Sequence, residues 1–119
     1  MPRTQEGSKF VTHLTALDST SDTDVYVVPK NFSSHVENLM ISNSNSANKN
    51  YTLKIYEKLT NVTHTLFSAH PVTGKDFENV FTNTIPLYLH AEDKIIIAAE
   101  TADTLTALIA TEEFFDPVR

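Results

Sequence analysis

The sequence predicts an all-β protein, a single antiparallel β-sandwich of about eight strands. Threonine is the most frequent of the 119 residues and asparagine and serine are abundant, whereas there are only 2 glycines. Threonine and other β-branched residues suit strands, and asparagine and serine suit turns. Short segments of alternating apolar and polar residues recur at intervals of roughly ten residues, and none has the length and period of an ordinary helix.

The N-terminal half contains four segments that read as strands. Residues 1–9 are polar, and we expect a mobile N-terminal arm there, followed by one domain at 10–119. A first strand alternates from Phe10 to Leu17, and a short one at 25–28 ends at Pro29. The asparagine- and serine-rich loop at 43–50 separates the next two segments, which we expect to pair as a hairpin.

The C-terminal half poses the question that decides the fold class. The apolar runs 95–99 and 105–110 could belong to one long helix or to two strands joined by a tight turn. Threonines between Thr101 and Thr111 restrict a helix, and the first run is too short for one. We therefore predict two strands, which leaves an antiparallel sandwich or barrel, and of these we expect a jelly-roll-like sandwich. The expected core comprises Val27, Leu39, Ile41, Leu53, Ile55, Phe81, Leu87, Ile95, Ile97 and Ile109.

Composition excludes several classes of function. There is no cysteine, so disulfides, thiolate metal sites and cysteine nucleophiles are impossible. The formal net charge of -6 disfavours binding to nucleic acid, because phosphates repel an acidic surface. No apolar run is long enough to span a bilayer, and the N-terminus lacks the apolar core of a signal peptide. We expect no nucleic-acid or membrane partner, and synthesis in a host cytoplasm.

Catalytic and metal-binding patterns are weak in this sequence. The five histidines form no pair at helical or tight strand spacing, although His64 and His70 could meet if the chain folds back. Asp18, Asp22 and Asp24 lack the glycine and distant glutamate of a calcium loop, and no serine lies in a nucleophile-elbow pattern. We therefore expect no catalytic residue, no metal and no cofactor.

Two long stretches carry a resemblance to a known class of proteins. Residues 28–58 have a Val-Pro opening, a strand ending in Ile-Ser-Asn, a polar loop and a Leu-Lys-Ile-Tyr strand. Residues 85–114 have an Ile-Pro, an Asp-Lys-Ile step and a closing alanine-rich strand that ends in acidic residues. Over about residues 25–115 the chain resembles small β-sandwich structural proteins of tailed bacteriophages. It departs from them at Glu92, where a glycine usually precedes the aspartate, so a turn with positive φ is in doubt there.

The resemblance implies a non-enzymatic virion protein on the outside of the particle, as a capsid decoration or a neck or tail component. Its partners would be other virion proteins, and we expect a homo-oligomer, with a trimer favoured. The candidate assembly contacts are Arg3 and Lys9 in the basic arm and the adjacent apolar pair Phe114 and Phe115.

The alternative is a ligand-binding sandwich such as a carbohydrate-binding module, whether or not it forms part of a host-recognition fibre. Sugar sites usually present exposed aromatic rings, above all tryptophan. The chain has no tryptophan, which leaves Tyr26, Tyr51, Tyr56 and Tyr88 for that role.

Overall fold

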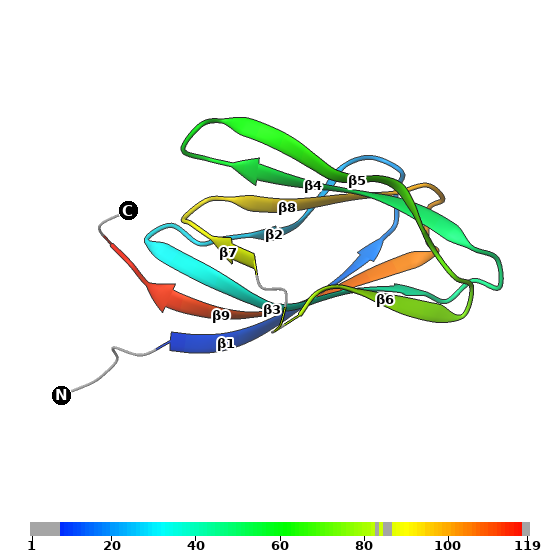
Figure 1. The fold of residues 1–119 in the computed structure, drawn as a ribbon, viewed down its shortest axis with the longest axis horizontal. Coiled ribbons are helices and arrows are strands. Elements are labelled where there is room, and N and C mark those ends of the chain that lie inside the picture. Colours follow the sequence, from blue (N-terminus) through cyan, green and yellow to red (C-terminus); the bar gives the residue numbers. More distant parts are fainter. Residues whose placement is uncertain (1–7, 83, 85–86, 118–119) are drawn as a thin grey trace.

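The computed structural model describes residues 8–82, 84 and 87–117, and these form a β-sandwich without any helix (Figure 1). One sheet has the strand order β1-β9-β3-β6, with β7 also paired to β3, and the other has the order β2-β8-β4-β5. All pairings are antiparallel. The strands are β1 (Ser8–Leu17), β2 (Thr23–Val27), β3 (Phe32–Asn43), β4 (Lys49–Glu57), β5 (Val62–Val72), β6 (Asp76–Phe81), β7 (Leu87–Leu89), β8 (Lys94–Ala99) and β9 (Leu105–Phe115).

The prediction of two strands in the C-terminal stretch is confirmed. β8 alternates half-buried and buried residues from Lys94 to Ala99, and β9 does so from Leu105 to Glu113. The two strands lie in different sheets, so the turn between them carries the chain across the sandwich. Its backbone includes Asp103 at a φ of 64°, and the Asp103 amide donates to the carbonyl of Leu17 over 2.9 Å.

The predicted hairpin across the polar loop is wrong. β3 belongs to the five-stranded sheet and β4 to the four-stranded one, so the loop crosses between sheets. The buried Asn43 holds this loop, because its side-chain amide donates to the carbonyls of Ala47 and Val72 over 3.0 Å each. The loop also packs closely on Gly74, where an added Cβ would lie 2.3 Å from the carbonyl oxygen of Ser46.

The structure has nine strands among the described residues, rather than the expected eight or so. The segment before residue 90 forms two of them, since β6 pairs with the C-terminal half of β3 and β7 with its N-terminal half. The first strand also begins earlier than expected. Ser8 and Lys9, which the sequence placed in the arm, pair with Phe114 and Glu113 of β9. Residues 1–7 of that arm lie outside the described residues.

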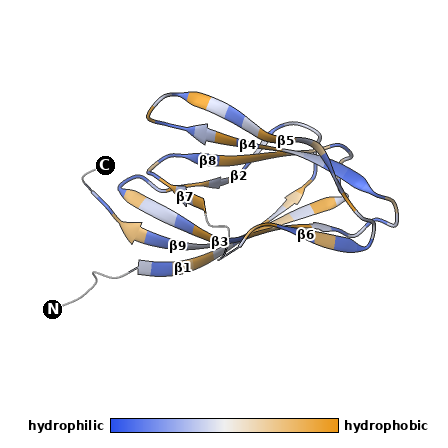
Figure 2. Ribbon diagram, viewed as in Figure 1, coloured by the Kyte–Doolittle hydropathy of each residue, from blue (hydrophilic) through white to orange (hydrophobic). Residues whose placement is uncertain are grey.

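The core lies between the two sheets, and apolar and polar residues alternate along the strands that enclose it (Figure 2). Most of the predicted core residues are buried, whereas Ile55, Phe81 and Leu87 are half-buried and pack against the core. The prediction that Val27 belongs to the core is wrong, because its side chain is 44% exposed. A bulge between Asp24 and Tyr26 shifts the alternation, so that both Val25 and Tyr26 point inward and Val27 points out.

Candidate assembly surface

The outer side of the five-stranded sheet carries several exposed apolar side chains. Its outward side chains lie in register across the strands, with Leu14 opposite Leu108 and Leu108 opposite Met40. Phe10 and Leu14 are 75% and 68% exposed. We call this surface the apolar face and define it by Phe10, Leu14, Met40, Phe77, Tyr88, Leu108, Ala110 and Phe114. Exposed apolar residues that cluster in this way are typical of surfaces that bind another protein.

The two outer surfaces of the sandwich differ in charge. Among the described residues of β1, β3 and β9, the side chains that bring a formal charge to the apolar face are Glu37 and Glu112, both negative. The opposite sheet instead carries ion pairs on its outside, Lys54 with Asp22 at 2.9 Å and Lys94 with Asp24 at 3.3 Å. Depletion of charge is typical of the centre of protein interfaces, which singles out the five-stranded sheet.

Two of the four residues expected to make assembly contacts meet at one end of the sandwich. The Lys9 ammonium lies 5.0 Å from the centre of the Phe32 ring, and Phe32 meets Phe115 edge to face at 5.6 Å. Phe115 remains 64% exposed. The sequence did not indicate Phe32, because its contact depends on the pairing of β3 with β9, far apart in the chain.

The other two expected contacts lie elsewhere. Phe114 points to the opposite side of β9 from Phe115, belongs to the apolar face and is 40% exposed. The exposed fractions of Phe114 and Phe115 leave both side chains available to a partner. Arg3 lies outside the described residues.

A buried polar network lies beneath Lys9, between the two sheets. The Tyr26 hydroxyl is 2.7 Å from Glu113 Oε2 and 2.9 Å from Ser34 Oγ. A phenol has one proton, which the carboxylate attracts more strongly, so Ser34 in turn donates to the Tyr26 oxygen. Lys9 reaches the other carboxylate oxygen at 3.7 Å, and His13 Nε2 lies 4.0 Å from Oε2.

This network is arranged for structure rather than for catalysis. Ser34 and Glu113 are only 2% and 3% exposed, so a substrate could not reach them in the closed sandwich. The Ser34 hydroxyl contacts a phenol, which is not a general base at neutral pH. Burial, and then the hydrogen bond to Glu113, raise the pKa of Tyr26 well above its usual value, so this phenol stays protonated.

The histidines and acidic residues singled out in the sequence are dispersed. His64 and His70 do not meet: His64 faces Glu57 at 3.8 Å, and His70 hydrogen-bonds Glu78 at 2.7 Å. Asp22 and Asp24 each form an ion pair with a lysine of the four-stranded sheet.

Asp93 is buried and serves the turns at one end of the sandwich. Its carboxylate accepts hydrogen bonds from the backbone amides of Lys58 and His90 over 2.9 and 2.8 Å. The carboxylate thereby joins the turn after β4 to the turn before β8, which is a structural role.

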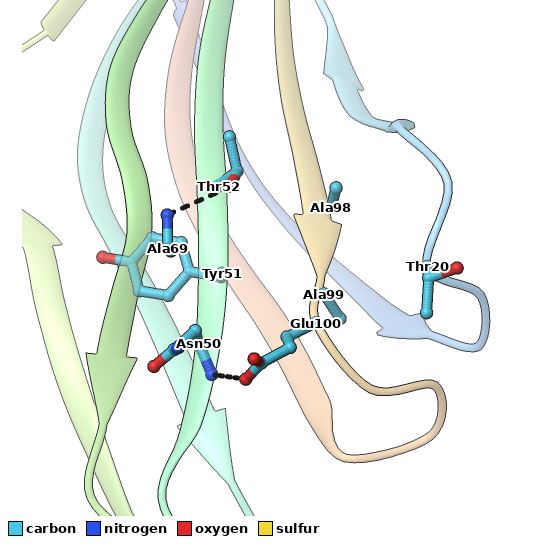
Figure 3. Close-up of a pocket in the computed structure, with 8 residues that line it drawn as sticks. All are labelled: Thr20, Asn50, Tyr51, Thr52, Ala69, Ala98, Ala99 and Glu100. Carbon is cyan, nitrogen blue, oxygen red and sulfur yellow. Dashed lines mark hydrogen bonds between the residues drawn. The ribbon is translucent and has the colours of Figure 1, made fainter.

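A hollow where β4 begins and β8 ends in the four-stranded sheet has a volume of about 300 Å³ (Figure 3). Glu100 lies at its rim and accepts a hydrogen bond from the backbone amide of Asn50. Ala98 and Ala99 line the hollow with small side chains. Its one aromatic lining residue, Tyr51, is fully buried and offers no ring face to a sugar.

The other tyrosines also bear on the carbohydrate-binding alternative. Tyr26 is buried, and the half-buried Tyr56 carries the Lys94 ammonium 5.4 Å from its ring centre. Tyr88 is 68% exposed, and one face of its ring stacks on His35 at 4.7 Å. Of the four tyrosines, Tyr88 alone therefore presents most of its surface to solvent.

Comparison of the sequence with protein-family models and with curated proteins finds no match. Within the described part of the chain there is no helix that could cross a membrane. The fold and the apolar face are therefore the observations on which a functional conclusion rests.

Proposed function

We propose that this chain is a non-enzymatic structural protein of a bacteriophage particle, attached to the outside of the virion by protein–protein contacts. The apolar face is the observation that supports this proposal most. Its exposed apolar side chains gain free energy when they are buried against another protein. The resemblance of residues 25–115 to small phage β-sandwich proteins supplies the virion context. Other virion proteins, in the capsid, neck or tail, are the proposed partners.

The strand order also supports a jelly roll as the fold of this virion protein. Nested pairs run from the ends of the chain inward: β1 with β9, β2 with β8, β3 with β6 and β7, and β4 with β5. The nesting supports a jelly roll, with β6 and β7 together in the place of one strand.

The apolar face is proposed to bind another copy of the same chain. Copies with a net charge of -6 repel one another, so a self-interface must use the part of the surface with the fewest carboxylates. β1 is also an edge strand of its sheet, so its exposed Phe10 and Leu14 lie along the edge of the sandwich. The proposed state is a closed homo-oligomer, with a trimer favoured, and Phe114 lies at its interface.

Attachment to the particle is assigned to the N-terminal residues 1–9 with Arg3 and Lys9, and to the neighbouring Phe115. Lys9 and Phe115 already lie together around Phe32 at the end where β1 begins. A partner that binds there would contact a cation and an aromatic ring side by side, a combination that is favourable in protein interfaces.

Analytical ultracentrifugation of the purified chain tests the self-interface. We expect an oligomer that Leu14→Glu or Leu108→Glu converts to monomer, because either change places a carboxylate in the apolar contact. The matched control is Leu66→Glu, since Leu66 is 45% exposed on the other sheet and its replacement should leave the oligomer intact. A wild-type monomer at high concentration, or equal disruption by the control, would refute the proposed interface.

A further inference from the structure

Three potential metal ligands converge on the apolar face. His35 and Glu37 come from β3, and Glu112 comes from β9, where it pairs directly with His35. Glu37 is the extra residue of a bulge between Val36 and Asn38. The bulge brings its carboxylate within reach of His35, with 3.0 Å between Glu37 Oε2 and His35 Nδ1.

The spacing of the ligand atoms suits a single cation. One ligand atom from each of the three residues lies within 4.8 Å of the other two. Ligands about 2.1 Å from one ion are separated by about 3.0–3.4 Å at the bond angles of octahedral and tetrahedral sites. The His35–Glu37 pair already has this spacing, and a small rotation of the Glu112 side chain completes the set.

Neighbouring side chains hold two of these ligands in place. Tyr88 stacks on the His35 ring at 4.7 Å and 19°, and the Ser8 hydroxyl hydrogen-bonds Glu112 Oε2. Among the described residues His35 Nε2 is buried without a hydrogen-bond partner, whereas Nδ1 lies 3.0 Å from Glu37 Oε2, so Nδ1 is the ring nitrogen available to a cation. Such supporting contacts are typical of metal sites, where they orient the ligands.

Within the described part of the chain, the carboxylates of the cluster have no lysine or arginine beside them. Among the described residues, no lysine or arginine lies within 4.0 Å of the carboxylates of Glu37 or Glu112, whereas Lys9 approaches the adjacent Glu113. His35 and Glu37 are only 19% and 25% exposed, so water screens the Glu37 carboxylate incompletely. A divalent cation would supply positive charge to this cluster.

We propose that His35, Glu37 and Glu112 bind one first-row divalent cation, for which Zn²⁺ is the natural probe. An imidazole nitrogen with two carboxylate oxygens suits Zn²⁺ better than Mg²⁺ or Ca²⁺, which prefer oxygen ligands alone. With three protein ligands, at least one coordination position stays open to water. The ion ties β9 to the bulge of β3, between Ala110 and Phe114 of the apolar face. This proposal is independent of the virion role.

Calorimetric titration of the metal-free chain with ZnCl₂ is the test. We expect one ion per chain at micromolar affinity or tighter, and no comparable binding of MgCl₂ or CaCl₂. His35→Ala and Glu112→Gln should each weaken Zn²⁺ binding by at least about tenfold, because each removes one ligand of three. Thermal unfolding should shift upward with Zn²⁺ in the wild type and much less in the variants.

The matched controls are His64→Ala and Glu57→Gln, which alter a histidine–glutamate pair with 3.8 Å between its atoms and with no third ligand in the cluster. They should leave Zn²⁺ affinity unchanged. If His35→Ala fails to fold, Co²⁺ titration of the wild type replaces it, and visible bands of nitrogen- and oxygen-coordinated Co²⁺ are expected. Absence of Zn²⁺ binding, undiminished binding in the double variant His35→Ala, Glu112→Gln, or loss of binding in the controls would overturn the proposal.

Discussion

Glu92 occupies a backbone conformation that favours glycine. Its φ is 68°, so the turn with positive φ that was in doubt at this position does exist, with a glutamate in place of a glycine. The Glu92 amide donates to the carbonyl of Val28 over 2.9 Å, and the Val28 amide donates to the carbonyl of Asp93 over 3.0 Å. These two hydrogen bonds join the turn before β8 to the chain after β2 and hold Glu92 in place.

Glu92→Gly should therefore stabilise the protein. The change relieves the strain of a side chain at positive φ, and the greater entropy of glycine in the unfolded chain offsets part of that gain. We expect a net gain of about 0.5–1 kcal/mol in the free energy of unfolding, measured by urea denaturation. Ala91→Gly, one residue earlier and outside the positive-φ region, is the control and should destabilise. A loss of stability in Glu92→Gly would show that the Glu92 side chain itself is needed.

Tyr26 gives the stability of the protein a dependence on alkaline pH. Its pKa is raised in the folded state, so the native chain keeps a proton that the unfolded chain loses above pH of about 10. The contribution of Tyr26 is complete below that pH and declines above it. At neutral pH, Tyr26→Phe should cost about 1–3 kcal/mol, because buried Glu113 loses its hydrogen-bond donor.

The difference in unfolding free energy between the wild type and Tyr26→Phe should narrow as the pH rises from 9 to 11 or so. Urea denaturation across this range measures it. Tyr88→Phe, at the exposed tyrosine, is the control and should cost clearly less than Tyr26→Phe at neutral pH. A constant difference for Tyr26→Phe would contradict a raised pKa in the folded state.

At the scale of the element, β8 shows how the alternation of a strand determines energetics. Ile95 and Ile97 are fully buried between the sheets, whereas Ile96 points outward and is half-buried. Ile97→Ala should destabilise by about 2–5 kcal/mol, because it leaves a cavity in the core. Ile96→Ala should cost clearly less. Equal losses in urea denaturation would mean that the register of β8 differs from that described.

Local pattern was sufficient to predict most strands but not their partners. The alternation of Tyr51, Leu53 and Ile55 and the threonines of β9 identified those strands correctly, because side-chain period and β-branching act over a few residues. The hairpin prediction failed because the choice between the neighbouring strand and a distant one depends on the closing of the whole sandwich. The prediction of a buried Val27 failed because a bulge in β2 shifts the alternation of inward and outward side chains. The sequence shows no signature of this bulge.

The same limit applies to the candidate sites. Lys9 and Phe115 were predicted as contacts from composition and position, but their shared partner Phe32 depends on the pairing of β3 with β9. The cluster of His35, Glu37 and Glu112 was missed for the same reason, since its third member lies 75 residues beyond its second. Spacing along the chain carries no signal for a cluster that a sheet assembles from distant strands.

At the scale of the whole molecule, the two sides of the sandwich suggest a division of roles. The four-stranded sheet has lysine–aspartate pairs on its outside, which suit contact with water. The five-stranded sheet presents the apolar face, and the termini of the described chain emerge at one end of the molecule (Figure 1). A subunit of this kind can use one face for self-association and the end with Lys9 and Phe115 for attachment to a larger particle.

A density map of virions purified from infected cells that make this chain is the most direct measurement of the central claim. We predict that the sandwich lies on the outside of the particle, with Leu14, Leu108 and Phe114 covered by a neighbouring protein subunit and the charged four-stranded sheet facing water. The number of copies would distinguish a decoration of the shell, with hundreds, from a neck or tail component, with about a dozen. Absence of the chain from the particles, or an apolar face left open to solvent on them, would contradict the account.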